Sequence, residues 1–455
     1  MNFVSLEFLI LFPLICIGYA LLSEKRIWIW LLGASLLFYF LHSPQAAGIL
    51  LTMIVVSYCV SLKIAAEPEE RRKRLWLWAY VVFGLTVLIF FKSSGYPPVG
   101  ISFYTFQTLS YVIDVYHRKI QPEKHLGYYA LFVSFFPQLV AGPIERPEKL
   151  LPQLRTPAKI NWENLLCGVE RITVGFFKKL VVADCLGVFA DRVYQAPGEA
   201  NGIAVAVGTV FFAFQIYCDF SGYSDIACGA ARIFGVRLTE NFDMPYLAPS
   251  PRQFWKKWHI SLTNWLTDYV YKPLGGNRKG LAVWCINIMV VFLCSGLWHG
   301  WGLHYVIWGV CHGIFLVAEV LLVNYSRVRK MNAASGGGRV MYGLKCAGTF
   351  FQVCFTWIFF RAECTADAFA MISNLFSGWS AEGFRQAGEL LQMKWLDLFQ
   401  ILLGLLCMYN MDKKKDNLNL RRSALGLYFI FTAIFLAWLI LLSSGAGNAF
   451  IYFQF

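Results

Sequence analysis

Two histidines lie on either side of one long apolar stretch, and this arrangement can support acid–base chemistry. His259 precedes the stretch, His299 follows it, and both are surrounded by aromatic residues. A neutral imidazole in a dry pocket can accept a proton from a hydroxyl group near pH 7, while a second imidazole can position or polarise the other reactant. Because the chain has no E-x-x-H or H-E-x-x-H spacing, we predict acid–base work at this pair and no metal site.

His299 occupies an unusual position for a polar side chain. It belongs to the sequence SGLWHG, residues 295–300, at the end of the uncharged run 281–297. A polar ring in the membrane interior costs several kcal/mol unless it is paired or used. The sequence leaves two interpretations open: a partner holds His299, or His299 takes part in a reaction.

The segment 252–280 is predicted to form an amphipathic helix at the membrane interface, with its tryptophans at headgroup level. At about 100° per residue, one arc of this helix is apolar and aromatic and holds Trp255, Trp258, Leu262, Trp265, Leu266 and Tyr269. The opposite arc is polar and holds Lys256, Lys257, Asn264, Thr267 and Asp268. His259 falls at the border between the arcs, where its ring can turn toward the protein interior.

The basic charges of this segment have two possible uses. Lys256, Lys257, Arg278 and Lys279 could meet anionic lipid, or they could receive an anionic reactant from the cytoplasm. A basic surface does not distinguish these two uses.

The composition indicates a polytopic all-α membrane protein. Of the 455 residues, 58% are hydrophobic and only 15% are charged, against about 25% in soluble domains. Apolar stretches long enough to span a bilayer recur along the chain, so we predict one embedded domain over 1–455, in which 203–218 and 222–236 are separate spans. The thirteen cysteines are scattered and indicate neither a disulfide framework nor a zinc site.

The net charge of +13 is informative through its placement. Basic residues in short loops mark the cytoplasmic side, which places both chain ends outside. The apolar stretch 3–22 lacks a basic start and a cleavage site, so we expect it to be a retained first helix. We interpret the excess charge as a sign of topology and lipid contact and expect no nucleic-acid partner.

Several long motifs resemble the membrane-bound O-acyltransferase (MBOAT) family. FWKKWHISLTNWLTDYVYKPLGGNR and SGLWHGWGLHYVIWGVCHG are similar to its two signature regions. GISFYTFQTLSYVIDVY, FPQLVAGPIERP and QIYCDFSGYSDIACGAARIFG match its bacterial branch, whose members acetylate alginate or peptidoglycan or D-alanylate teichoic acid. The resemblance runs from near residue 90 to the end of the chain.

The resemblance implies a fold and site residues. The fold would be a ring of about 11 or more transmembrane helices, with re-entrant and interfacial helices, around a thinned centre with a through-tunnel. His299 would correspond to the catalytic histidine, within the region 281–324, and His259 to a second active-site histidine. Donor-binding or tunnel-lining roles could fall to Lys256, Lys257, Trp258, Asn264, Asp268, Trp298, Asp219 and Asp225. For Asp219 and Asp225, near Arg232, a buried structural ion pair is an equally open interpretation.

The resemblance also implies an activity. The chain would take an acyl group, most simply acetyl, from a cytoplasmic thioester donor such as acetyl-CoA or an acyl carrier protein, without a bound cofactor. It would pass the group across the bacterial cytoplasmic membrane to a cell-envelope polysaccharide, with help from an extracytoplasmic transferase of the SGNH or serine-hydrolase type. D-alanyl transfer to teichoic acid is the alternative within the family.

Two further interpretations stay open. The tail 444–455 ends in FIYFQF, which is either an interfacial anchor or, by resemblance to motifs in related systems, a segment whose Tyr452 carries the acyl group on the outer side.

A proton-coupled transporter whose histidines relay protons is an alternative of another class, but it predicts inverted halves, which we do not find in the sequence.

Overall fold

The computed structural model describes residues 3–94, 97–139, 142–328 and 338–414. These residues fold into helices joined by short connections, and none of the described residues forms a strand. The chain forms two compact units, unit 1 with Met1–Phe176 and Tyr223–Glu240 and unit 2 with Phe177–Gly222 and Asn241–Phe455. The prediction of helical architecture is confirmed for the described residues.

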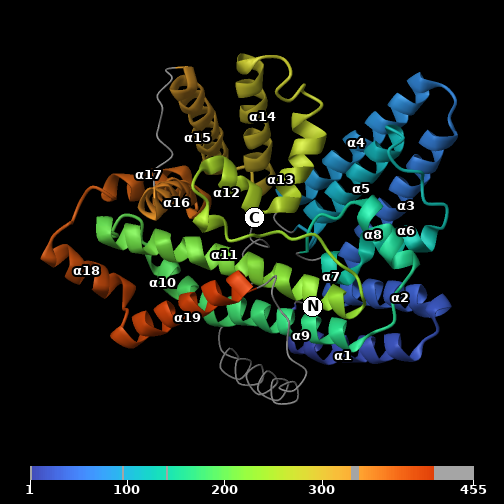
Figure 1. Ribbon diagram of the computed structural model, residues 1–455, viewed down its shortest axis with the longest axis horizontal. Coiled ribbons are helices and arrows are strands. Elements are labelled where there is room, and N and C mark those ends of the chain that lie inside the picture. Colours follow the sequence, from blue (N-terminus) through green and yellow to red (C-terminus); the bar gives the residue numbers. More distant parts are fainter. Residues whose placement is uncertain (1–2, 95–96, 140–141, 329–337, 415–455) are drawn as a thin grey trace. The chain divides into compact units, whose positions relative to one another are not determined.

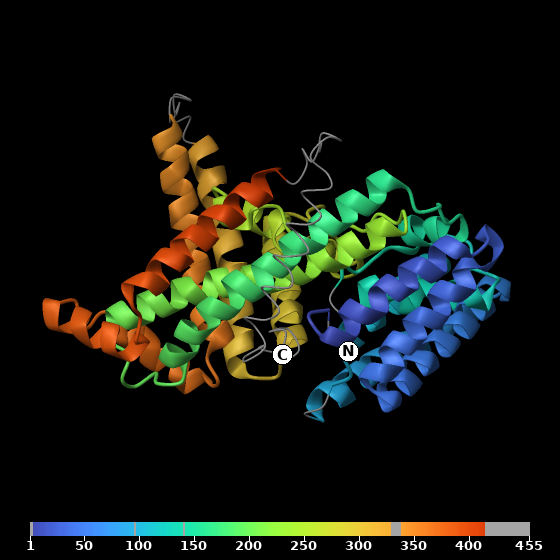
Figure 2. The ribbon, with the colours of Figure 1, turned by 90° about the horizontal axis from the view of Figure 1, so that it is seen from below.

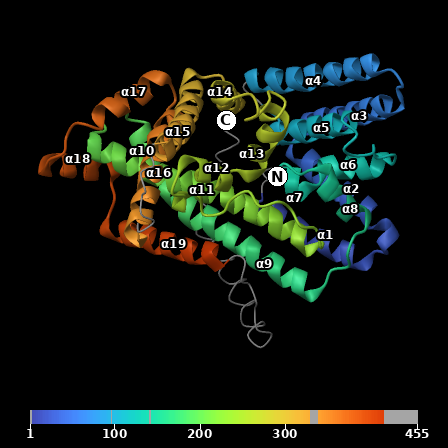
Figure 3. The same cartoon turned by 45° about the horizontal axis from the view of Figure 1, so that its top comes forward.

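Unit 1 is a group of apolar helices. Its helices are α1 (Leu6–Leu21), α2 (Glu24–His42), α3 (Pro44–Ala66), α4 (Glu70–Ser93), α5 (Ile101–Tyr116), α6 (Leu126–Ser134), α7 (Phe136–Leu139), α8 (Pro147–Arg155) and α9 (Trp162–Phe176). The three helices α3, α4 and α5 pack side by side (Figure 3). Ser43 caps the start of α3 through its hydroxyl, and Pro44 takes the first helical position, where a missing N–H costs nothing.

Unit 2 contains the segments with both histidines. Its helices are a π-helix (Phe177–Ala183), α10 (Asp184–Tyr194), α11 (Gly202–Ile233, whose residues from Tyr223 belong to unit 1), a 3-10 turn (Pro245–Leu247), α12 (Pro251–Lys257), α13 (Ile260–Leu266), a second π-helix (Thr267–Tyr271), α14 (Leu281–His299), α15 (Leu303–Val328), α16 (Arg339–Arg361), α17 (Thr365–Asn374), α18 (Ala381–Leu391) and α19 (Trp395–Lys414). In Figure 2, α19 lies beside the first π-helix, which it contacts.

Six of the described helices are long and apolar enough to cross a membrane, namely α3, α4, α11, α14, α15 and α16. A seventh candidate arises if α18 and α19, which meet at 79°, form one broken span. Helix α1 is apolar but has only 16 residues. The chain is therefore a multi-pass membrane protein, while about 11 spans and a through-tunnel stay predictions.

One predicted boundary is wrong. The stretches 203–218 and 222–236 were expected as two spans, but α11 runs unbroken through Gly202–Ile233. This helix carries Asp219, a charged residue inside an apolar stretch. In the structure Nζ of Lys179 lies 2.7 Å from a carboxylate oxygen of Asp219, so the charge is neutralised inside the protein and the backbone stays helical.

Close packing of α14 against α15 places His299 (Figure 1). Glycines stand where the two backbones approach. A Cβ atom on Gly296 would lie 2.4 Å from the main-chain oxygen of Tyr305, and one on Gly309 would lie 2.3 Å from that of Phe292. Small residues of this kind let membrane helices approach closely.

Candidate active site

His299 is enclosed by aromatic rings. It is the last residue of α14, and only 4% of its surface is exposed. Its ring centroid lies 4.7 Å from that of Trp298, 5.1 Å from Trp308 on α15 and 4.8 Å from Phe360 on α16. We call these three rings the aromatic cage. Three rings packed in this way keep water from the imidazole.

His259 lies in a break between two short helices. Helix α12 ends at Lys257, Trp258 is extended, and His259 has a φ of 43°, in the left-handed region. The ring is 1% exposed and touches Phe220 of α11 edge-on, with centroids 4.7 Å apart. Burial lowers the pKa of His259 to about 3, so the imidazole is neutral at physiological pH.

Asn241 stabilises the backbone that directly follows His259. Its main-chain oxygen accepts the N–H of Ile260 at 3.0 Å, and its side-chain oxygen accepts the N–H of Ser261 at 3.3 Å. These bonds occupy two of the free donors at the start of α13. Asn241 was not identified from the sequence, where its only signal is a polar residue shortly before the aromatic segment.

The structure brings the two predicted histidines to one indole. Trp298 contacts His259 with ring centroids 5.8 Å apart, and it directly precedes His299 in the chain. Trp298 itself is 8% exposed. His259, Trp298 and His299 therefore lie together in one buried place, and the indole of Trp298 contacts both imidazoles.

The predicted continuous helix over 252–280 is wrong, although most of its predicted apolar arc is buried. The chain instead forms α12, α13 and a π-helix, because the left-handed conformation at His259 interrupts the helical hydrogen bonds. Five of the six residues of that arc are buried, namely Trp255, Trp258, Leu262, Trp265 and Leu266, while Tyr269 is half-buried.

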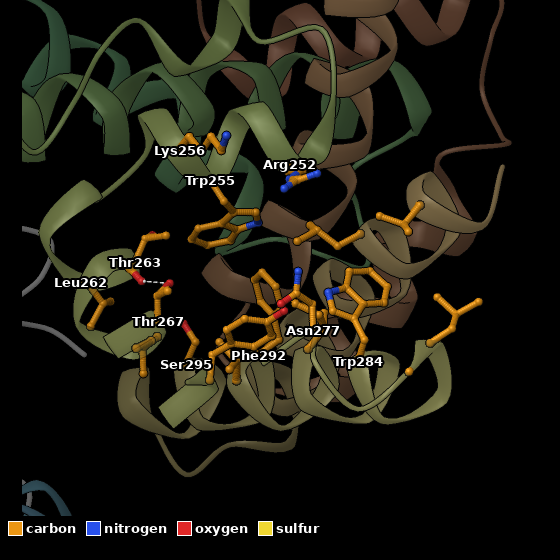
Figure 4. Close-up of a pocket in the computed structure, with 18 residues that line it drawn as sticks. Arg252, Trp255, Lys256, Leu262, Thr263, Thr267, Asn277, Trp284, Phe292 and Ser295 are labelled. Carbon is orange, nitrogen blue, oxygen red and sulfur yellow. Dashed lines mark hydrogen bonds between the residues drawn. The ribbon is translucent and has the colours of Figure 1, made fainter. Parts of the chain in front are cut away.

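A cavity of about 590 Å³ lies between this segment and α14 (Figure 4). Trp255 from α12 and Trp284 and Phe292 from α14 point into it. Arg252 and Lys256 line it as well and bring positive charge to a mainly apolar space. Ser295, one helical turn before His299, also lines the cavity, whereas neither His259 nor His299 does.

The other predicted donor-binding residues separate into different environments. Lys257 forms an ion pair with Asp243, with 2.8 Å between Nζ and the carboxylate oxygen, and Asp268 pairs with Lys272 at 2.6 Å. Asn264 is exposed on α13.

Trp258 packs in an aromatic cluster with Phe242, Phe254 and Trp357. Among the predicted residues, Lys256 lines the cavity, while Arg252 and Ser295 were missed.

Asp219 and Asp225 are held in buried ion pairs, which was the structural interpretation of the sequence. Asp219 pairs with Lys179 in unit 2. Asp225 pairs with Arg171 in unit 1, at 3.0 Å between the guanidinium nitrogen and the carboxylate oxygen. Arg232, the basic residue near them in the sequence, is not the partner in either of these bonds. Tunnel lining by the two aspartates stays a prediction. Tyr452 and the tail 444–455 lie outside the described residues.

The chain is similar to proteins that are named as acyltransferases. Residues 36–366 match the model of the membrane-bound O-acyltransferase family. The probable alginate O-acetylase AlgI of Pseudomonas aeruginosa is 36% identical over 402 residues, which cover 83% of this chain and 75% of the relative. The peptidoglycan O-acetyltransferase of Helicobacter pylori is 33% identical, covering 76% of this chain and 73% of the relative. The teichoic acid D-alanyltransferase of Bacillus subtilis is 25% identical and covers 58% of this chain and 69% of the relative. With its buried histidines in the two signature segments, the chain belongs to the membrane-bound O-acyltransferase family and is an acyltransferase.

Proposed function

We propose that the chain takes an acetyl group from a cytoplasmic thioester and transfers it across the bacterial cytoplasmic membrane for O-acetylation of a cell-envelope polysaccharide. The observation that carries the proposal is the caged His299 one helical turn from a cavity with a basic lining. The names of the alginate and peptidoglycan relatives favour acetyl over D-alanyl, since they match more of the chain at higher identity than the D-alanyltransferases.

The cavity fits an anionic thioester such as acetyl-CoA or the prosthetic arm of an acyl carrier protein. Arg252 and Lys256 would bind phosphate groups, and the apolar walls would hold the chain that carries the thioester. This assigns to Lys256 the use in donor binding that its charge alone left open. The thioester carbonyl would come to lie beyond Ser295, toward His299.

In the chemical step, neutral His299 accepts the proton of an attacking hydroxyl group as its oxygen bonds to the thioester carbonyl carbon. The tetrahedral intermediate then collapses, the carbon–sulfur bond breaks, and the leaving thiolate takes the proton from the imidazolium. His259 positions the reacting groups from the other side of Trp298 and stays neutral, in keeping with its lowered pKa. The aromatic cage keeps water from hydrolysing the thioester.

Tyr452 is the proposed first acceptor of the acetyl group, through its phenolic hydroxyl on the outer side of the membrane. A separate extracytoplasmic transferase of the SGNH or serine-hydrolase type would then move the group from the phenol ester to the polysaccharide. The test is Tyr452→Phe, which keeps the aromatic ring and deletes the hydroxyl. Loss of polysaccharide acetylation is expected, and full acetylation by the variant would reject this relay.

The proposed function is tested with inside-out membrane vesicles supplied with acetyl-CoA or D-alanyl carrier protein, each labelled in its acyl group. Label from acetyl-CoA should appear in the envelope polymer and disappear with His299→Ala. His117→Ala removes an exposed histidine of unit 1 and is the matched control. Transfer of D-alanine alone would favour the other family activity, and undiminished transfer by His299→Ala would exclude the proposed base.

A further inference from the structure

Another buried histidine, His312, has been given no role so far. It lies on α15 and is 1% exposed. Its Nδ1 lies 3.2 Å from Nε1 of Trp255 on α12, and its Nε2 lies 2.9 Å from Oγ1 of Thr356 on α16. One imidazole therefore joins three helices of unit 2.

The partners of His312 determine where its proton lies. An indole N–H can only donate, so Nδ1 of His312 accepts from Trp255 and carries no proton. The ring proton then lies on Nε2 and is donated to the hydroxyl oxygen of Thr356. Thr356 in turn donates to the main-chain oxygen of Val353, 2.8 Å away. These hydrogen bonds run in one direction from α12 to α16, and a neutral Nε2–H imidazole satisfies each of them.

His312 also contacts both parts of the site. Trp255 lines the cavity and packs against Phe292, with centroids 5.1 Å apart. Trp308 lies 5.0 Å from His312 and 5.1 Å from His299, measured between ring centroids. A shift of the His312 ring would move a wall of the cavity and a wall of the aromatic cage together, since interiors of this density transmit displacements.

We propose that His312 is a positioning residue for acyl transfer. As the Nε2–H tautomer, His312 fixes the position of Trp255, in the donor cavity, relative to the aromatic cage around His299. The inference rests on the proposed function, because the position of Trp255 matters for transfer only when the donor occupies the cavity. His312 itself touches no reacting atom in this scheme. Its contribution is to hold the indole that the donor meets.

The tautomer can be measured without activity. A chain labelled with 15N-histidine contains seven imidazoles, and the His312 signals are those that vanish in His312→Asn. We expect 15N shifts of a neutral ring with the proton on Nε2, and a change in these shifts when Trp255→Phe removes the indole donor. An Nδ1–H tautomer or an imidazolium would overturn the assignment.

Kinetics with His312→Ala and His312→Asn test the positioning. The amide oxygen of asparagine can take the place of Nδ1 and accept from Trp255, whereas alanine cannot. We expect the donor KM to rise about 10-fold in the alanine variant and to return to within about 3-fold of wild type in the asparagine variant, with kcat changed less than KM. Equal effects of both variants, or a loss confined to kcat, would reject a positioning role.

A milder pair serves if the His312 variants do not fold. Thr356→Val removes the hydroxyl that receives the Nε2 proton, and Thr356→Ser keeps it. The valine variant should raise the donor KM and the serine variant should not; equal KM values would contradict a role for the His312–Thr356 hydrogen bond in positioning. Failure of the proposed function can be told apart from failure of this inference. If the proposed function is wrong, the wild-type chain transfers no acetyl group in the vesicle assay, whatever tautomer of His312 the 15N spectrum shows.

Discussion

Trp298 and His259 are in ring contact, with centroids 5.8 Å apart, although they lie 39 positions apart in the sequence. Because Trp298 also precedes His299 directly, its indole sets the spacing of the two imidazoles. We expect Trp298→Ala to lower kcat about 100-fold, since small displacements of reacting groups cost that much. Trp298→Phe keeps an aromatic wall and should lose far less. Initial rates of acetyl transfer measure both, and a wild-type kcat in the alanine variant would contradict this role.

His259 should make the stability of the protein depend on pH. Its pKa is about 3 in the folded protein and about 6.5 when unfolded, so below pH 6.5 the unfolded state binds the extra proton. The group contributes nothing above pH 6.5, and the free energy of unfolding falls by about 1.4 kcal/mol per pH unit as the pH drops from 6.5 toward 3.

The measurement is the unfolding free energy in detergent at several pH values. His259→Asn is the matched variant, because asparagine tolerates the left-handed backbone and does not titrate in this range. Its stability should fall less steeply with acid than that of the wild type. Parallel curves for the two proteins would show that His259 is not buried in its neutral form.

The general location of the site could be predicted from the sequence, because both histidines lie in long aromatic motifs whose order along the chain is specific. The break at His259 could not. Local propensity favours one continuous helix there, and the left-handed turn depends on hydrogen bonds that Ile260 and Ser261 donate to Asn241, a tertiary partner that periodicity does not reveal.

The environments of two neighbouring lysines could not be predicted from the sequence either. Lys256 and Lys257 both fall on the polar arc of the predicted helix, yet Lys256 lines the cavity and Lys257 pairs with Asp243. Burial and pairing depend on which segment packs alongside. Likewise, the carboxylate of Asp219 would be unfavourable alone in the apolar helix α11, and its compensating partner Lys179 lies on another helix.

Asn241→Ala should destabilise the turn that carries His259. The main-chain N–H of Ser261 loses its acceptor in a buried place, which costs about 1–3 kcal/mol. Asn241→Asp keeps an acceptor oxygen and should retain more stability and more activity. Thermal unfolding in detergent and kcat report the two effects. If the alanine and aspartate variants behave alike, the hydrogen bond to Ser261 does not hold the turn.

Gly309→Ala should weaken the packing of α14 on α15. The new Cβ atom would lie 2.3 Å from the main-chain oxygen of Phe292, so the helices must separate, at a cost of about 1–3 kcal/mol. Gly343→Ala on α16 is the matched control, because no described atom beyond its own stretch of helix lies within 4 Å of its Cβ position, and alanine favours helix by about 1 kcal/mol. The unfolding midpoint should fall for the first variant and hold or rise for the second. Equal midpoints would contradict the close approach of the helices.

Removal of the positive charges at the cavity should weaken binding of an anionic donor. Arg252→Ala and Lys256→Ala each remove one exposed charge, so the donor KM should rise about 2- to 5-fold in each, with kcat nearly unchanged. The wild-type KM should also rise with salt, since ions screen exposed charges, and the variants should respond less. Lys345→Ala, an exposed lysine of α16 that does not line the cavity, is the matched control. If Arg252→Ala and Lys256→Ala both keep the wild-type KM and its salt dependence, the donor does not enter through this cavity, and the two charges serve lipid contact instead.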